Sequence, residues 1–124
     1  MRSKRLLRTH RDDEPIAVHL REFHRRLNAE RFGGELTTIV VRISRRMRSR
    51  LGHYAPAQRG APAEIAISQQ HLKRHGFEQA LQTLLHEMVH QWQDEKKFPL
   101  DHGPAFRAKA RAVGITARAT RRID

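Results

Sequence analysis

The stretch TLLHEMVHQW, residues 83–92, places two histidines four residues apart, with a glutamate directly after the first. Residues four apart lie on the same face of a helix, so His86 and His90 can direct two imidazoles at one metal ion. Glu87 follows the first histidine, where its carboxylate can hold a water molecule on the metal. The HExxH spacing therefore predicts a metal site on a helix.

The motif belongs to a long apolar segment. Apolar side chains recur at helical spacing from Phe77 onward, and no helix breaker occurs before Pro99. The residues that flank the two histidines are uncharged, and a buried imidazole or carboxylate without a partner is costly. We therefore favour a metal site over the alternative that His86 and His90 are hydrogen-bonded core histidines while Glu87 faces solvent.

A catalytic zinc normally has three protein ligands and one open position, so a third ligand is expected after this helix. Asp94 lies one turn beyond His90. There it can bind the metal ion itself, or hydrogen-bond to a residue that binds the ion. His102, twelve residues after His90 and at the start of the next expected helix, fits the third position better. Asp101 before it is interpreted as a helix cap, with orientation of a ligand as the alternative.

The remaining patterns predict an α+β domain around this helix. Runs of β-branched residues alternate with amphipathic segments, and glycines and prolines separate them. The expected sheet is small, antiparallel or mixed, with about three strands. Further helices are expected over about 15–31, 69–75 and 104–113, and strands over 35–44, 51–56 and 63–68.

The chain has 124 residues, the size of a single domain. We expect a flexible basic arm at 1–14, one compact domain at 15–114 and a basic tail at 115–124. Cysteine is absent, which excludes disulfides, thiolate zinc sites and a cysteine nucleophile. Any metal ligand in this chain is therefore a histidine or a carboxylate.

Basic residues dominate the charge. Lysine and arginine total 25 against 13 acidic residues, for a formal net charge of +12. A surplus of this size favours contact with single- or double-stranded DNA, and a solvated basic surface is the alternative. Sixteen of these 25 basic residues are concentrated in three groups: Arg2, Lys4, Arg5, Arg8 and Arg11; Arg42, Arg45, Arg46, Arg48 and Arg50; and Arg107, Lys109, Arg111, Arg118, Arg121 and Arg122.

No apolar run approaches the roughly 18 residues that a membrane span requires, and the N-terminus lacks the apolar core of a signal peptide. We expect a cytoplasmic protein, located on the nucleoid if it binds DNA, with no membrane partner. A monomer is expected.

HEMVHQW followed by DHGPAF resembles the signature of the SprT-like, or Spartan-type, metalloprotease domain, which pairs HExxH with a later HGxxF. The segments FGGEL, LGHYAP and EIAIS extend the resemblance over roughly residues 15–114. It implies a compact zincin-like fold with His86, His90 and His102 as zinc ligands and Glu87 as general base. It also implies cleavage of proteins, often ones bound or crosslinked to DNA, as in DNA–protein crosslink repair. The cysteine zinc ribbon of many members is absent here.

These residues predict a zinc-dependent endopeptidase acting on a protein or peptide. Zinc would lower the pKa of a bound water toward about 7, and Glu87 would pass its proton to the leaving amine. His53 and Tyr54 are candidates for a second electrophile, with strand packing as the alternative. The strand at 63–68 is expected to be the sheet edge on which an extended substrate pairs, and an ordinary paired strand is the alternative.

Two other functions stay open. One is a basic nucleic-acid-binding module with a structural zinc, and the other is a metal-dependent hydrolase acting on something other than protein. A structural site has no use for a base beside an open position, which favours the peptidase. Trp92 is interpreted as a core residue rather than a base-stacking platform. Surface or helix-face positions are expected for His10, His19, His24, His71 and His75.

Overall fold

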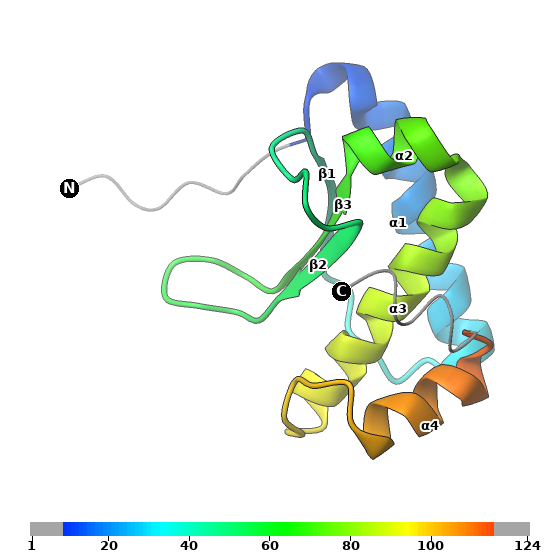
Figure 1. Cartoon of the computed structure of the whole chain (residues 1–124). Helices are drawn as coiled ribbons and strands as arrows, with labels where there is room; N and C mark the ends of the chain where they lie inside the picture. Colours follow the sequence, from blue (N-terminus) through cyan, green and yellow to red (C-terminus); the bar gives the residue numbers. More distant parts are fainter. Residues whose placement is uncertain (1–8, 116–124) are drawn as a thin grey trace.

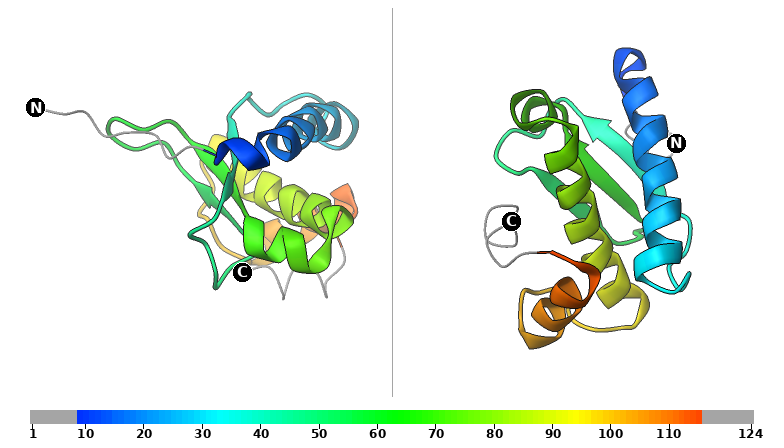
Figure 2. Two further views of the ribbon diagram at one scale, coloured as in Figure 1. Left: turned by 90° about the horizontal axis from the view of Figure 1, so that it is seen from above. Right: turned by 90° about the vertical axis from the view of Figure 1, so that its right-hand side faces the viewer.

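The computed structural model describes residues 9–115, in which two long helices lie side by side across one face of a three-stranded sheet (Figures 1 and 2). The α+β class predicted from the sequence is confirmed. The elements in chain order are η1 (Arg11–Asp13), α1 (Glu14–Arg31), β1 (Val40–Ser44), β2 (Gly52–Ala55), β3 (Glu64–Ser68), α2 (Gln69–His75), α3 (Phe77–Glu95) and α4 (Pro104–Val113).

The sheet is mixed, with strand order β1-β3-β2. β3 runs parallel to β1 and antiparallel to β2, so it is the central strand. The expectation that residues 63–68 form the sheet edge is therefore wrong. Ile65, Ala66 and Ile67 are all buried, as is typical of a strand with neighbours on both sides. β2 is the edge strand that contacts α3.

The strand expected over 35–44 is shorter in the structure, because its first half is held by side chains instead of a neighbouring strand. Asn28 near the end of α1 accepts a hydrogen bond from the Leu36 backbone N–H and donates one to the Leu36 carbonyl. The backbone N–H of Thr37 donates to the Glu95 carboxylate. These contacts use the groups that strand pairing would need, so β1 begins only at Val40.

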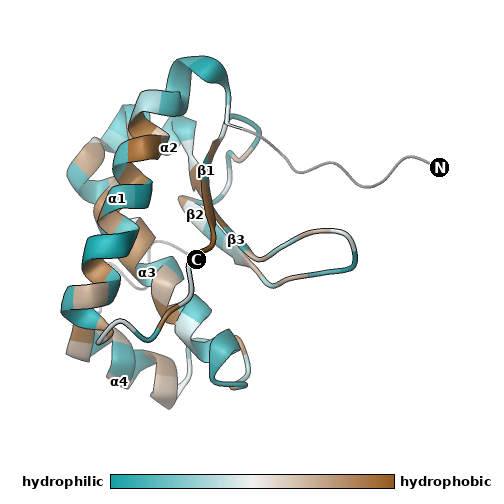
Figure 3. Ribbon diagram, turned by 180° about the vertical axis from the view of Figure 1, so that it is seen from behind, coloured by the Kyte–Doolittle hydropathy of each residue, from teal (hydrophilic) through white to brown (hydrophobic). Residues whose placement is uncertain are grey.

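The core lies between the sheet and the helices. Val41 and Ile67 from the sheet meet Leu20 of α1 and Leu84 and Met88 of α3, and all are buried. Figure 3 shows long hydrophobic stretches in the strands, whereas the helices alternate hydrophobic and hydrophilic turns. Residues 83–91 of α3, which include the HExxH motif, are all buried.

The helix ends follow the sequence signals. The Ser68 side chain accepts from the His71 backbone N–H and caps α2, and Gly76 ends that helix with a φ of 90°. Gly114 ends α4 in the left-handed conformation that favours glycine. Pro104 opens α4, as expected for a first-turn proline.

The basic arm and tail expected at the two ends fall mostly on residues 1–8 and 116–124, outside the described residues. Residues at the end of the predicted arm lie against the domain. The Thr9 hydroxyl accepts a hydrogen bond from the Ile43 N–H, and Arg45 donates two hydrogen bonds to Asp13. Between residues 9 and 115, no helix has both the length and the apolar character needed to cross a bilayer.

Candidate metal centre

Three histidines converge at the C-terminal half of α3. His86 and His90 come from α3, and His102 comes from the loop that precedes α4. One ring nitrogen of each lies within 4.8 Å of those of the other two, and the Nε2 atoms of His90 and His102 are 3.1 Å apart. His86 and His90 are buried, whereas His102 is exposed, so the cluster opens to solvent on the His102 side.

The donor set fits a metal ion. Zinc binds imidazole nitrogen at about 2.0–2.1 Å, so two nitrogens on one ion are at most about 4 Å apart. The 3.1 Å separation between His90 and His102 falls within this limit. Imidazole ligands suit zinc and other late transition metals. The three residues can therefore hold such an ion, which the sequence spacing predicted to be zinc.

A phenylalanine from α4 underlies all three rings. The centroid of the Phe106 ring lies 5.0 Å from that of His86, 4.7 Å from that of His90 and 4.8 Å from that of His102. Phe106 is fully buried, and α4 packs along the end of α3 (Figure 1). The HGxxF spacing therefore places the exposed His102 and the phenylalanine that packs against its ring four residues apart.

Glu87 is fully buried and lies between α3 and the edge strand β2. A Cβ on Gly52 of β2 would lie 2.5 Å from Thr83 Cγ2, closer than real contacts allow, and 3.3 Å from Glu87 Cγ, which is a tight contact. Glycine at this position lets the strand approach α3. The buried carboxylate is consequently next to the edge of the sheet.

A glutamine connects the cluster to the loop before α4. His90 Nδ1 lies 2.8 Å from Gln93 Oε1, and Gln93 Nε2 donates to the Asp101 carbonyl at 3.1 Å and to its Oδ1 at 3.4 Å. Asp101 was expected to cap α4, but the N-cap is Gly103, which makes no side-chain cap bond. Asp101 Oδ1 instead accepts from the Gly103 N–H at 3.0 Å.

Sequence reasoning missed Gln93, although a signal was present: it follows His90 by three residues, which places both on one face of the helix.

The alternative ligand and the electrophile candidates lie beside the cluster. Asp94 is not part of it, because its Oδ2 accepts a hydrogen bond of 2.6 Å from the Tyr54 hydroxyl. Burial, together with the neighbouring Asp94 carboxylate, raises the pKa of Tyr54. Side chains alternate along a strand, so His53 faces away from α3, and its Nδ1 lies 2.6 Å from Arg50 Nη1.

His24 differs from the surface or helix-face position expected for it. It is buried, and its Nε2 lies 2.8 Å from Gln91 Oε1. Burial lowers the pKa of His24, and the Gln91 hydrogen bond and the Glu95 charge act in the opposite direction. Helical periodicity alone could not show which histidine of α1 would meet α3.

Trp92 is half-buried, stacks edge-on with Phe98 and lies under the Lys109 ammonium. It packs against the core, as the sequence interpretation expected.

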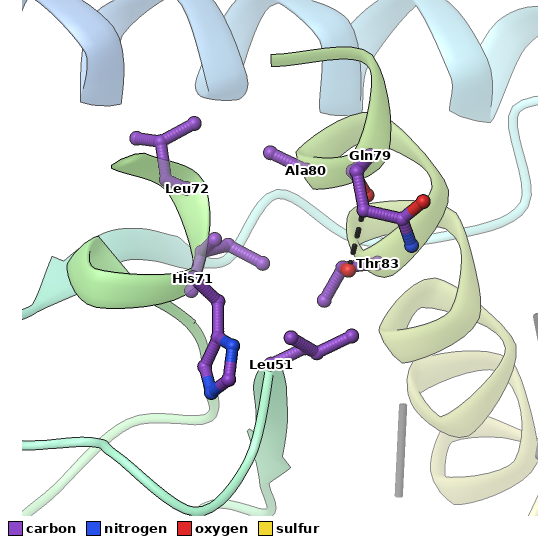
Figure 4. Close-up of a pocket in the computed structure, with 7 residues that line it drawn as sticks. Leu51, His71, Leu72, Gln79, Ala80 and Thr83 are labelled. Atoms are coloured by element: carbon purple, nitrogen blue, oxygen red, sulfur yellow. Dashed lines mark hydrogen bonds between the residues drawn. The ribbon is translucent and has the colours of Figure 1, made fainter. Parts of the chain in front are cut away.

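A separate small hollow lies one turn before the motif, between α2, the start of β2 and α3 (Figure 4). Thr83 Oγ1 donates to the Gln79 carbonyl at its wall. None of the clustered histidines contributes to the lining, which comprises Leu51, Ile67, His71, Leu72, Gln79, Ala80 and Thr83.

The model of the SprT-like family matches residues 20–123, which is most of the chain. The matched segment includes the HExxH helix and His102. A search of curated proteins found no match. The resemblance noted in the sequence is confirmed by a match that spans the sheet, α3 and α4. The chain belongs to the SprT-like family.

Proposed function

We propose that this chain is a zinc-dependent endopeptidase that hydrolyses peptide bonds of protein substrates. One observation carries the proposal: three imidazoles converge beside a buried glutamate on the HExxH helix of a SprT-like chain. Zinc held by His86, His90 and His102 would supply a Lewis acid and a bound water whose pKa is lowered to about 7. His102 is the exposed member of the cluster, so a substrate carbonyl would approach the ion from that side.

Glu87 is the proposed general base. It follows His86 directly and is enclosed by α3 and β2, where few solvent molecules compete for its carboxylate. In this role it accepts a proton from the attacking water and returns it to the leaving amine. Its buried position keeps the carboxylate in one place through both transfers.

The edge strand β2 is the proposed docking site for the substrate backbone. One side of β2 pairs with β3, and no strand of residues 9–115 pairs with its other side. Gly52 brings this strand into contact with the helix turn that carries Glu87. An extended peptide could add to β2 by main-chain hydrogen bonds, which favours unfolded segments and little sequence specificity.

Glu87→Gln tests this function. The variant keeps the size of the side chain but removes the proton acceptor. We expect unchanged folding and zinc content, and a loss of cleavage of at least about 100-fold on an unfolded protein substrate. Cleavage at the parental rate would contradict the peptidase mechanism. Hydrolysis of a small ester without any protein cleavage would favour the non-protease hydrolase.

DNA is the proposed polyanionic partner, contacted through the turn between β1 and β2. Two arginines near this turn are already paired with acids, Arg42 with Glu64 and Arg45 with Asp13, both at 2.8 Å. The other arginines of the turn, Arg46, Arg48 and Arg50, are exposed and make no ion pair with an acid among the described residues. Their guanidinium groups can bind phosphate oxygens, which requires no particular base sequence.

A salt titration tests this contact. If the protein neutralises about four phosphates of single-stranded DNA, the logarithm of the association constant should fall with the logarithm of the salt concentration at a slope of roughly -3. Replacing Arg46, Arg48 and Arg50 together by glutamine should flatten the slope by about two units. A matched triple variant at Arg107, Lys109 and Arg111 in α4 serves as the control. Equal slopes in the parent and the turn variant would remove this surface as the DNA contact.

A further inference from the structure

Gln93 is almost completely buried, and the groups around it decide how its amide is oriented. On one side lie the carbonyl oxygen and Oδ1 of Asp101, at 3.1 and 3.4 Å from Nε2. A backbone carbonyl can only accept hydrogen bonds, so the NH2 group of Gln93 must face Asp101. Oε1 is consequently the atom that faces His90.

This orientation determines where the proton of His90 resides. Gln93 Oε1 can only accept, and it lies 2.8 Å from His90 Nδ1, so Nδ1 carries the hydrogen. In a neutral imidazole the other nitrogen then carries no hydrogen and offers its lone pair as an acceptor or ligand. Nε2 of His90 is the atom that lies 3.1 Å from His102 Nε2, inside the histidine cluster.

We infer that Gln93 is a positioning residue that holds His90 in the Nδ1–H tautomer and thereby presents its Nε2 lone pair to the metal site. The inference rests on the proposed zinc site. The same amide ties the loop carrying the third histidine to α3, because its NH2 group binds Asp101, the residue before His102. One buried side chain therefore orients one ligand and anchors the loop of another.

The chain contains its own control. Gln91, two residues earlier on α3, is also fully buried and also contacts a histidine, but that histidine is His24 and lies outside the cluster. Removing its amide disturbs the packing of α3 without touching the clustered histidines. A comparison of Gln93→Met with Gln91→Met therefore separates positioning of His90 from general loss of a buried hydrogen bond.

The first measurement is made on the metal-free protein. Long-range proton–nitrogen NMR correlations report which nitrogen of His90 carries the hydrogen. We expect the Nδ1–H form alone in the parent and in Gln91→Met, and a mixture of tautomers in Gln93→Met. Gln93→Glu keeps an acceptor opposite Nδ1 and should restore the Nδ1–H form. An unchanged tautomer in Gln93→Met, or a mixture in Gln93→Glu, would overturn the inference.

The second measurement is zinc affinity by competition with a chromogenic chelator. Removing the group that hydrogen-bonds a metal-binding histidine typically lowers metal affinity about 10–100-fold. We expect a loss of zinc affinity of about that size for Gln93→Met. Gln91→Met should stay within the order of magnitude of the parent, and Gln93→Glu should fall between the parent and Gln93→Met, because it keeps the acceptor opposite Nδ1 but loses the donor to Asp101. Equal affinities of Gln93→Met and the parent would overturn the inference.

The two hypotheses fail separately. A parent protein that binds no zinc would refute the proposed function, and the tautomer spectrum would still decide the role of Gln93. If Gln93→Met does not fold, Gln93→Glu decides through its tautomer: the Nδ1–H form alone supports the inference, and a mixture of tautomers, with an acceptor still opposite Nδ1, would overturn it.

Discussion

Two glutamine–histidine pairs lie on opposite sides of α3, and they hold their histidines in opposite tautomers. Gln91 Oε1 is 2.8 Å from His24 Nε2, and Gln93 Oε1 is 2.8 Å from His90 Nδ1. A glutamine oxygen only accepts, so the hydrogen is on Nε2 in His24 and on Nδ1 in His90. The same two residue types thus give an inter-helix contact in one case and a nitrogen directed into the histidine cluster in the other.

The surroundings of each amide produce this difference. Gln91 donates its NH2 group to the Thr37 carbonyl and to the Glu95 carboxylate, both at 2.8 Å, so its pair joins α1, α3 and the segment before β1. Gln93 donates to the Asp101 carbonyl in the loop before α4. The first pair stabilises the packing of the domain, and the second orients a residue that the proposed chemistry requires.

The strongest effect should be a loss of bound zinc on changing the histidine cluster. His102→Ala should remove most of the bound zinc from a parent that carries one ion per chain, because it removes a donor of the histidine cluster. Metal analysis of the purified protein measures this loss. Asp94→Ala is the control, since Asp94 binds the Tyr54 hydroxyl instead of joining the cluster. Equal zinc content in His102→Ala and the parent would disprove the ligand assignment.

A smaller effect, on the stability of the fold, is expected from changing the Gln91–His24 pair. Gln91→Met leaves the His24 N–H and the Thr37 carbonyl without their buried partner, which should lower the free energy of unfolding by about 1–3 kcal/mol. Urea unfolding of the metal-free protein measures the loss. Zinc affinity should not change. Weakened zinc binding with unchanged stability would reverse the roles of the two glutamines.

The smallest effect concerns pH. Burial lowers the pKa of His24 in the folded state, whereas the unfolded chain takes up this proton near pH 6.5. Below that pH the unfolded state binds more protons, so the free energy of unfolding should fall with decreasing pH, by at most about 1.4 kcal/mol per unit.

His24→Gln keeps a donor toward Gln91 but does not titrate, so its stability should depend less on pH over the range from about 7 to 5. The difference between parent and variant, measured by urea unfolding of the metal-free proteins, isolates His24 from the other histidines. A parallel pH dependence in the two proteins would show that burial of His24 carries no proton linkage.

Local patterns in the sequence predicted the helices, the strands and the candidate metal donors. Periodicity and end signals located α1, α3 and α4 to within a residue or two, because helical spacing, Pro104 and Gly114 act locally. The i, i+4 spacing of His86 and His90 and the later HGxxF predicted three histidines that the structure brings together. These features depend on neighbours in the chain, which a sequence displays directly.

The position of each strand in the sheet and the contacts between buried side chains could not be predicted from these local patterns. β3 is central because a crossover brings β1 alongside it, although β2 precedes it in the chain. His24 and Gln91 are 67 residues apart, and no local pattern predicts their contact. Strand order, burial and amide orientation all depend on residues that are distant in sequence. The positions of those residues are set only when the whole core packs.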